Sequence, residues 1–65
     1  MRIEINGEAQ DVAATTVEGA LTELGWGEAR VATALNGDFL PAAARADTAL
    51  SDGDRLEVLA PMQGG

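Results

Sequence analysis

The chain has 65 residues, with 11 acidic and 4 basic side chains and a net charge of −7. A chain this short forms one small domain, and its negative charge argues against partners such as nucleic acid or an anionic membrane surface. It contains no cysteine and no histidine, which excludes disulfides, thiolate metal sites and the usual general base near neutral pH. Because it also lacks lysine and tyrosine, we expect a binding or carrier protein rather than an enzyme, with no metal site.

Hydrophobic residues make up 46% of the chain, but alanine supplies much of this share, and the only aromatic residues are Trp26 and Phe39. A lean core of this kind predicts a sheet packed against one helix. No apolar run approaches the roughly 20 residues of a membrane-spanning helix. The segment Met1–Glu4 lacks the apolar core of a secretory signal, so we expect a soluble, cytoplasmic protein.

Two short strands are predicted at the start of the chain. Apolar and polar residues alternate over residues 1–5, which is the period of a strand with one buried face. Asn6-Gly7 is a strong signal for a type I′ hairpin turn, because both central positions of that turn need a positive φ. A weaker strand over residues 9–12 would complete this hairpin.

A helix is predicted after residue 16. Thr15 and Thr16 are both candidate N-caps, and Thr15 with Glu18 has the spacing of a capping box. Gly25 is placed to end the helix in a left-handed conformation. Trp26 would then pack against the helix end, with partner contact as the alternative role. The predicted apolar face consists of Val17, Ala20, Leu21 and Leu24.

A second hairpin and a last strand are predicted in the remaining sequence. Residues 31–35 form its first strand, and Asn36-Gly37 forms its turn. A short return strand over residues 39–41 must be at an edge or end there, because Pro41 cannot donate a ladder hydrogen bond. Residues 41–47 are predicted to be irregular, with at most one helical turn.

The alternation of residues 55–60 predicts the last strand, after a turn at residues 51–54. The first and last strands are expected to lie side by side and parallel in the centre of the sheet. The predicted fold class is therefore α+β: a β-grasp roll with a mixed five-stranded sheet and one main helix packed on one face. Residues 1–60 form this domain, and residues 61–65 form a flexible tail.

The acidic residues offer no convincing catalytic or metal site. Asp52-Gly53-Asp54 lacks the further oxygen ligands of a calcium loop and is better explained as a tight turn. The hydroxyl groups have no base to activate them, and no phosphate-binding glycine motif follows a strand. The default interpretation of the acids is a solvated surface, with docking to a basic partner as the alternative.

The sequence ends in Gly64-Gly65. Five residues beyond Ala60 can extend about 3.3–3.6 Å each, which would place the terminal carboxylate well clear of the domain. Two residues without a Cβ can pass through a narrow channel beside a nucleotide. The carboxylate is unreactive until it is activated, most simply as an acyl-adenylate, and a partner enzyme must do this because the chain has no nucleotide site.

These features together resemble the ThiS family, the sulfur carrier proteins of thiamin biosynthesis, which have a ubiquitin-like β-grasp fold. The resemblance extends over nearly all of the sequence. One departure is that three alanines separate Pro41 from Arg45, whereas family members often have a basic residue directly after the proline. The segments that carry the resemblance are Met1–Gly7, Thr16-Val17 with Leu21 and Leu24, Ala34–Pro41, Leu50–Asp54 and Gly64-Gly65.

The resemblance implies a carrier cycle. An E1-like adenylyltransferase of the ThiF type would adenylate Gly65 with ATP and Mg²⁺, which the partner binds. A cysteine desulfurase or another sulfur donor would convert the acyl-adenylate into a thiocarboxylate. Thiazole synthase, of the ThiG type, would then receive the sulfur. On this interpretation Gly65 is the carrier residue and Gly64 provides a slender approach to it.

The partner-binding surface is predicted on the sheet face away from the helix. Leu59 is expected to be exposed there, joined by Ala32 and Ala34 or by Thr33 and Leu35, depending on the register, in a shallow apolar patch ringed by acids. Chance exposure of one leucine is the alternative. The other candidate partner-binding residues are Phe39, Met62 and Gln63.

Two other functions are compatible with a Gly-Gly terminus on this fold. One is the small subunit of molybdopterin synthase, which is also a sulfur carrier but is usually longer. The other is a ubiquitin-like modifier that is joined to target amines through Gly65. A plain interaction domain is a third possibility.

Overall fold

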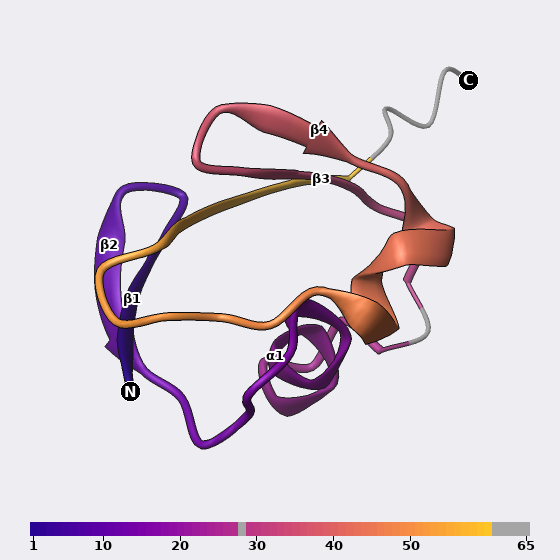
Figure 1. Cartoon of the computed structure of the whole chain (residues 1–65). Helices are drawn as coiled ribbons and strands as arrows, with labels where there is room; N and C mark the ends of the chain where they lie inside the picture. Colours follow the sequence, from indigo (N-terminus) through magenta and orange to yellow (C-terminus); the bar gives the residue numbers. More distant parts are fainter. Residues whose placement is uncertain (28, 61–65) are drawn as a thin grey trace.

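The computed structural model describes residues 1–27 and 29–60 (Figure 1). Its sheet has five strands in the order β2-β1-β5-β3-β4. The central pair, β1 and β5, is parallel, whereas β1 pairs antiparallel with β2, and β3 pairs antiparallel with both β4 and β5. The predicted mixed sheet with parallel first and last strands is therefore confirmed. The elements are β1 (Arg2–Ile5), β2 (Glu8–Asp11), α1 (Val17–Glu23), β3 (Ala32–Leu35), β4 (Asp38–Leu40), the 3-10 helix η1 (Ala42–Asp47) and β5 (Arg55–Leu59).

Both hairpins turn at an Asn-Gly pair, as predicted. Asn6 and Gly7 have φ values of 50° and 88°, and Asn36 and Gly37 have φ values of 52° and 89°. Positive φ at both central positions defines a type I′ turn, whose twist matches that of the strands it joins. The two turns thereby fix the registers of β1 with β2 and of β3 with β4.

The start of α1 differs from the prediction. Thr16, and not Thr15, is the N-cap, and its hydroxyl accepts a hydrogen bond from the backbone N–H of Gly19 at 3.1 Å. The predicted capping box of Thr15 with Glu18 is therefore wrong. Thr16 also forms a β-bridge with Ala49, so pairing with the chain before β5 selects which of the two threonines begins the helix.

The end of α1 follows the prediction. Gly25 has a φ of 92°, its N–H donates to the carbonyl of Thr22 at 3.1 Å, and the N–H of Trp26 donates to the carbonyl of Leu21 at 2.7 Å. These two bonds make a Schellman motif. Trp26 is half-buried and packs against the core, as expected for a residue that closes a helix end.

The core lies between α1 and the face of the sheet that β1 and β5 present to it. Alternate residues of these strands are buried, as their sequence pattern predicts. No helix within residues 1–27 and 29–60 is long and apolar enough to cross a membrane. The buried apolar residues are Ile3, Ile5, Val12, Val17, Ala20, Leu21, Leu50, Leu56 and Val58.

The segment that follows β4 is more regular than predicted. Residues 42–47 form η1 rather than an irregular stretch with at most one helical turn. Arg45 anchors this helix, because its guanidinium donates to the hydroxyl of Thr33 and to the carbonyl of Val31. Spacing in the sequence could not reveal this, since Arg45 lies on η1 whereas Thr33 lies on β3 and Val31 directly precedes that strand.

Candidate functional site

The sheet face turned away from α1 carries an apolar patch. In the register of the sheet, Ala32 lies opposite Leu59 and Ala34 lies opposite Phe39. Thr33 points to the other side and is buried. Of the two registers that the sequence left open, the structure thus has Ala32 and Ala34 beside Leu59. We call Ala32, Ala34, Phe39 and Leu59 the apolar patch.

Phe39 and Leu59 dominate this patch. Their exposed fractions are 72% and 70%, the largest among the large apolar residues that the structure describes. They border a shallow hollow of about 290 Å³, which Ala32, Ala34 and Glu57 also line. Because two large apolar side chains share this hollow, it is the candidate partner-binding surface.

The charges around the apolar patch are mixed rather than uniformly acidic. Glu57 lines the hollow itself. Next to it, towards the start of β5, a polar hollow of about 220 Å³ is lined by Glu4, Arg55 and Glu57 together with the turn residues Gly7 and Gly37. The predicted ring of acids is therefore incomplete, because Arg55 lies between two glutamates on this face.

The predicted carrier residues lie outside the described residues. These are Gly64 and Gly65, together with the candidate contact residues Met62 and Gln63. The structure does describe the point from which they follow, since β5 ends at Leu59 and Ala60 is the next residue. In Figure 1, β5 is the dark-yellow strand beside β3. The apolar patch is thus at the end of the strand that leads to the Gly-Gly segment.

The side chain of Asn6, whose sequence signal is that of the hairpin turn, also holds this end of β5. The main-chain pairing of β1 with β5 reaches Ile5 and Leu56. Beyond it, the Asn6 amide accepts a hydrogen bond from the N–H of Val58 at 2.8 Å and donates one to the Val58 carbonyl at 3.1 Å. The turn accounts for Asn6 in the sequence, so no separate signal pointed to this second role.

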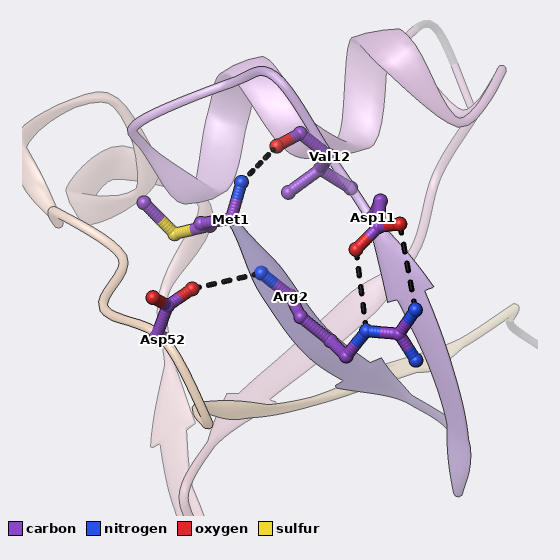
Figure 2. A network of polar contacts seen from close by, with 5 residues as sticks. All are labelled: Met1, Arg2, Asp11, Val12 and Asp52. Atoms are coloured by element: carbon purple, nitrogen blue, oxygen red, sulfur yellow. Dashed lines mark hydrogen bonds and ion pairs between the residues drawn. The ribbon is translucent and has the colours of Figure 1, made fainter.

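Polar contacts at the other end of the sheet fix the N-terminal strand (Figure 2). The backbone N–H of Arg2 donates to a carboxylate oxygen of Asp52 at 2.8 Å, and the amino group of Met1 donates to the carbonyl of Val12 at 2.8 Å. The ion pair between Arg2 and Asp11, at 3.3 Å, joins side chains that are 65% and 74% exposed, so it contributes little. These contacts are structural.

The acidic turn before β5 behaves as predicted. One carboxylate oxygen of Asp54 accepts a hydrogen bond from the N–H of Ser51 at 2.8 Å, which is local turn chemistry. Asp52 is used differently, because it bonds the distant backbone of Arg2. Within residues 1–27 and 29–60, no group of three or more acidic side chains is arranged to hold a metal ion.

Comparison with known proteins gives three findings. The model of the ThiS family matches residues 3–65. The crystal structure of the thiamine biosynthesis protein ThiS from Geobacter metallireducens superimposes with a TM-score of 0.84 at 33% identity, with 100% of each chain covered. A protein named thiazole synthase, from Paramagnetospirillum magneticum, is 41% identical over 66 aligned residues.

The alignment with the thiazole synthase covers 100% of this chain but 20% of the relative, so this chain spans about a fifth of the length of that protein. The match to the ThiS crystal structure, in contrast, is end to end and confirms the predicted β-grasp fold. The chain belongs to the ThiS family, whose members are small sulfur carrier proteins and not catalysts.

Proposed function

We propose that this chain carries sulfur to the thiazole ring of thiamin as a thiocarboxylate on Gly65. The observation that carries the proposal is the family match, which runs through Gly64-Gly65 to residue 65. The apolar patch supports it, because an accessible apolar surface lies at the end of β5, six residues before Gly65. Partner enzymes would supply the catalysis, and this chain would supply the reacting carboxylate and the surface by which it is held.

The proposed chemistry has three steps. An E1-like adenylyltransferase joins an oxygen of the Gly65 carboxylate to the α-phosphate of ATP and releases pyrophosphate, with Mg²⁺ bound by that enzyme. The persulfide of a sulfur donor then attacks the carbonyl carbon and expels AMP. A partner thiol cleaves the resulting S–S bond, which leaves a thiocarboxylate on Gly65 and a disulfide on the partners.

The proposed acceptor of the sulfur is thiazole synthase. Support comes from the relative of that name, in which a region 41% identical to this chain is part of a longer protein. A docked partner would contact Phe39 and Leu59, and Met62 and Gln63 would line the path to its active site. The reach of residues 61–65, about 3.3–3.6 Å per residue, limits how far the reactive centre can lie from the apolar patch. A cytoplasmic location remains a prediction.

Intact-mass measurement tests the proposal. The chain is incubated with ATP, Mg²⁺, an E1-like adenylyltransferase and a persulfide donor. We expect a mass increase equal to the replacement of one oxygen by sulfur, located on Gly65 by fragmentation. Conversion that persists after deletion of Gly65 would disprove the assignment. Adding thiazole synthase or, in parallel, the large subunit of a molybdopterin synthase shows which protein discharges the thiocarboxylate, and we expect only thiazole synthase to do so.

A further inference from the structure

The side chain of Asn6 takes the place of a strand residue beside β5. Its Oδ1 accepts from the N–H of Val58 at 2.8 Å, and its Nδ2 donates to the carbonyl of the same residue at 3.1 Å. Both bonds are partly buried and join residues 52 positions apart. One amide therefore satisfies both main-chain groups that Val58 directs towards β1, as a neighbouring strand would.

The chain needs this contact because β1 is shorter than β5. The last backbone bond from this side of the sheet runs from the N–H of Asn6 to the carbonyl of Leu56 at 3.0 Å. The main chain then reverses at Gly7, whose φ of 88° belongs to the hairpin turn. Without the Asn6 amide, the part of β5 from Val58 onward would be paired on one side only. The remaining partner would be β3, in which Ala32 lies opposite Leu59.

We infer that Asn6 is a positioning residue for the carrier segment: by holding Val58 from the β1 side, it fixes the direction in which the chain leaves the sheet towards Gly65. The inference rests on the proposed function. The carboxylate of Gly65 must reach a partner's active site. If the end of β5 is loosely held, that carboxylate is distributed over many unproductive positions. Small displacements of this kind lower rates strongly, and about 1 Å can cost roughly a hundredfold.

The second hairpin provides a matched control. Asn36 occupies the same position of the same turn type, with a φ of 52° compared with 50° for Asn6. Its amide also makes two hydrogen bonds to the β5 region, accepting from the N–H of Arg55 at 2.9 Å and donating to the Asp54 carboxylate at 3.0 Å. Those contacts hold the beginning of β5, so they stabilise the fold without fixing the direction in which the chain leaves β5.

The test compares Asn6→Gly with Asn36→Gly. Glycine tolerates the positive φ of both turns, so each change removes the side-chain bonds and leaves the turn possible. The rate of thiocarboxylate formation is measured with a saturating E1-like adenylyltransferase, ATP, Mg²⁺ and a persulfide donor. We expect Asn6→Gly to lower kcat by roughly 5- to 50-fold and Asn36→Gly by no more than about twofold. The KM for the partner should stay within about twofold in both, because β3 still holds Leu59 beside the other patch residues.

Hydrogen exchange provides a readout that does not depend on catalysis. The amide of Val58 should exchange at least about tenfold faster in Asn6→Gly than in the unchanged chain, and it should be little affected in Asn36→Gly. If Asn6→Gly is too unstable to assay, Asn6→Asp serves instead, because it keeps the acceptor for the Val58 N–H and loses the donor. Its kcat should be lower than that of the unchanged chain and lower than that of Asn36→Gly, but activity should not be lost completely.

Three results would overturn the inference. Equal kcat values for the Asn6 and Asn36 variants would show that the exit of β5 needs no support from Asn6. An unchanged exchange rate at Val58 would show that the amide does not hold this strand. Failure of the unchanged chain to form any thiocarboxylate would disprove the proposed function itself, and the inference with it, so the two failures are distinguishable.

Discussion

The guanidinium of Arg45 donates from Nε to the hydroxyl of Thr33 at 3.0 Å, and that hydroxyl donates in turn to the carbonyl of Leu40 at 2.8 Å. Thr33 is 2% exposed, so its polar group depends on these partners. The chain of contacts joins η1, β3 and β4. Because β3 also carries Ala32 and Ala34 of the apolar patch, a buried hydroxyl on one face of the strand supports the apolar patch on the other.

The change Thr33→Val keeps the shape of the side chain and removes its hydroxyl. It leaves the Leu40 carbonyl without this donor and Arg45 Nε without its acceptor. We expect the free energy of unfolding to fall by about 1–3 kcal/mol, measured by urea denaturation. Thr15→Val is the control, because Thr15 is exposed, and it should change stability by less than about 0.5 kcal/mol. Similar losses in the two variants would show that the buried hydroxyl is not important.

The N-cap of α1 can be tested with adjacent threonines. The Thr16 hydroxyl accepts from the Gly19 N–H, and Thr16→Ala should lower the free energy of unfolding by about 1 kcal/mol. Thr15→Ala should change it by less than about 0.5 kcal/mol, because among the described residues Thr15 bonds to another segment through its backbone carbonyl alone, which accepts from the N–H of Leu50. A larger loss for Thr15 in urea denaturation would restore the capping box that the sequence predicted.

The two glutamates of α1 should also differ in how much they contribute to the free energy of unfolding. Glu23 accepts hydrogen bonds from the backbone N–H groups of Ala13 and Ala14, at 2.9–3.0 Å. It thereby fixes the chain that enters the helix. Glu23→Ala should lower the free energy of unfolding by about 1 kcal/mol, whereas Glu18→Ala should cost less than about 0.5 kcal/mol. Thermal unfolding measures both, and equal midpoints would contradict the structural role of Glu23.

The strands and turns could be predicted because their signals are local. Alternation over residues 1–5 and 55–60 marks one buried face for β1 and β5, and the Asn-Gly pairs require a positive φ that few other residues adopt. The N-cap could not be assigned in this way. Thr15 and Thr16 are equivalent in sequence, and the bridge of Thr16 with Ala49, a contact distant in the chain, distinguishes them.

The candidate site shows the same division between local and distant causes. Exposure of Leu59 follows from its place in the alternating last strand. Its pairing with Ala32 and the position of Phe39 beside Ala34 depend on the register of three strands, which the sequence left open. The contact of Asn6 with Val58 was out of reach as well, because the turn already explained the asparagine.

Docking through the apolar patch is tested by Leu59→Asp and Phe39→Asp. Each change places a charge on an apolar contact surface, where a covered charge would be unpaired. We expect the Kd for the E1-like adenylyltransferase, measured by titration calorimetry, to increase at least about tenfold for each variant, the effect of losing one important interface residue. Stability should change little, because both side chains are more than two-thirds exposed in the free chain.

The variant Ala46→Asp separates the effect of an added negative charge on binding from the effect of its position. Ala46 is exposed on η1, outside the apolar patch, and this variant has the same added charge as the other two. If the long-range charge alone governed association with a basic partner, all three variants would bind equally well or slightly better than the unchanged chain. Weakening confined to the Leu59 and Phe39 variants, with Ala46→Asp within about twofold of the unchanged chain, would show that apolar contact at the end of β5 holds the partner. Equal Kd values for all three would exclude the apolar patch as the docking surface.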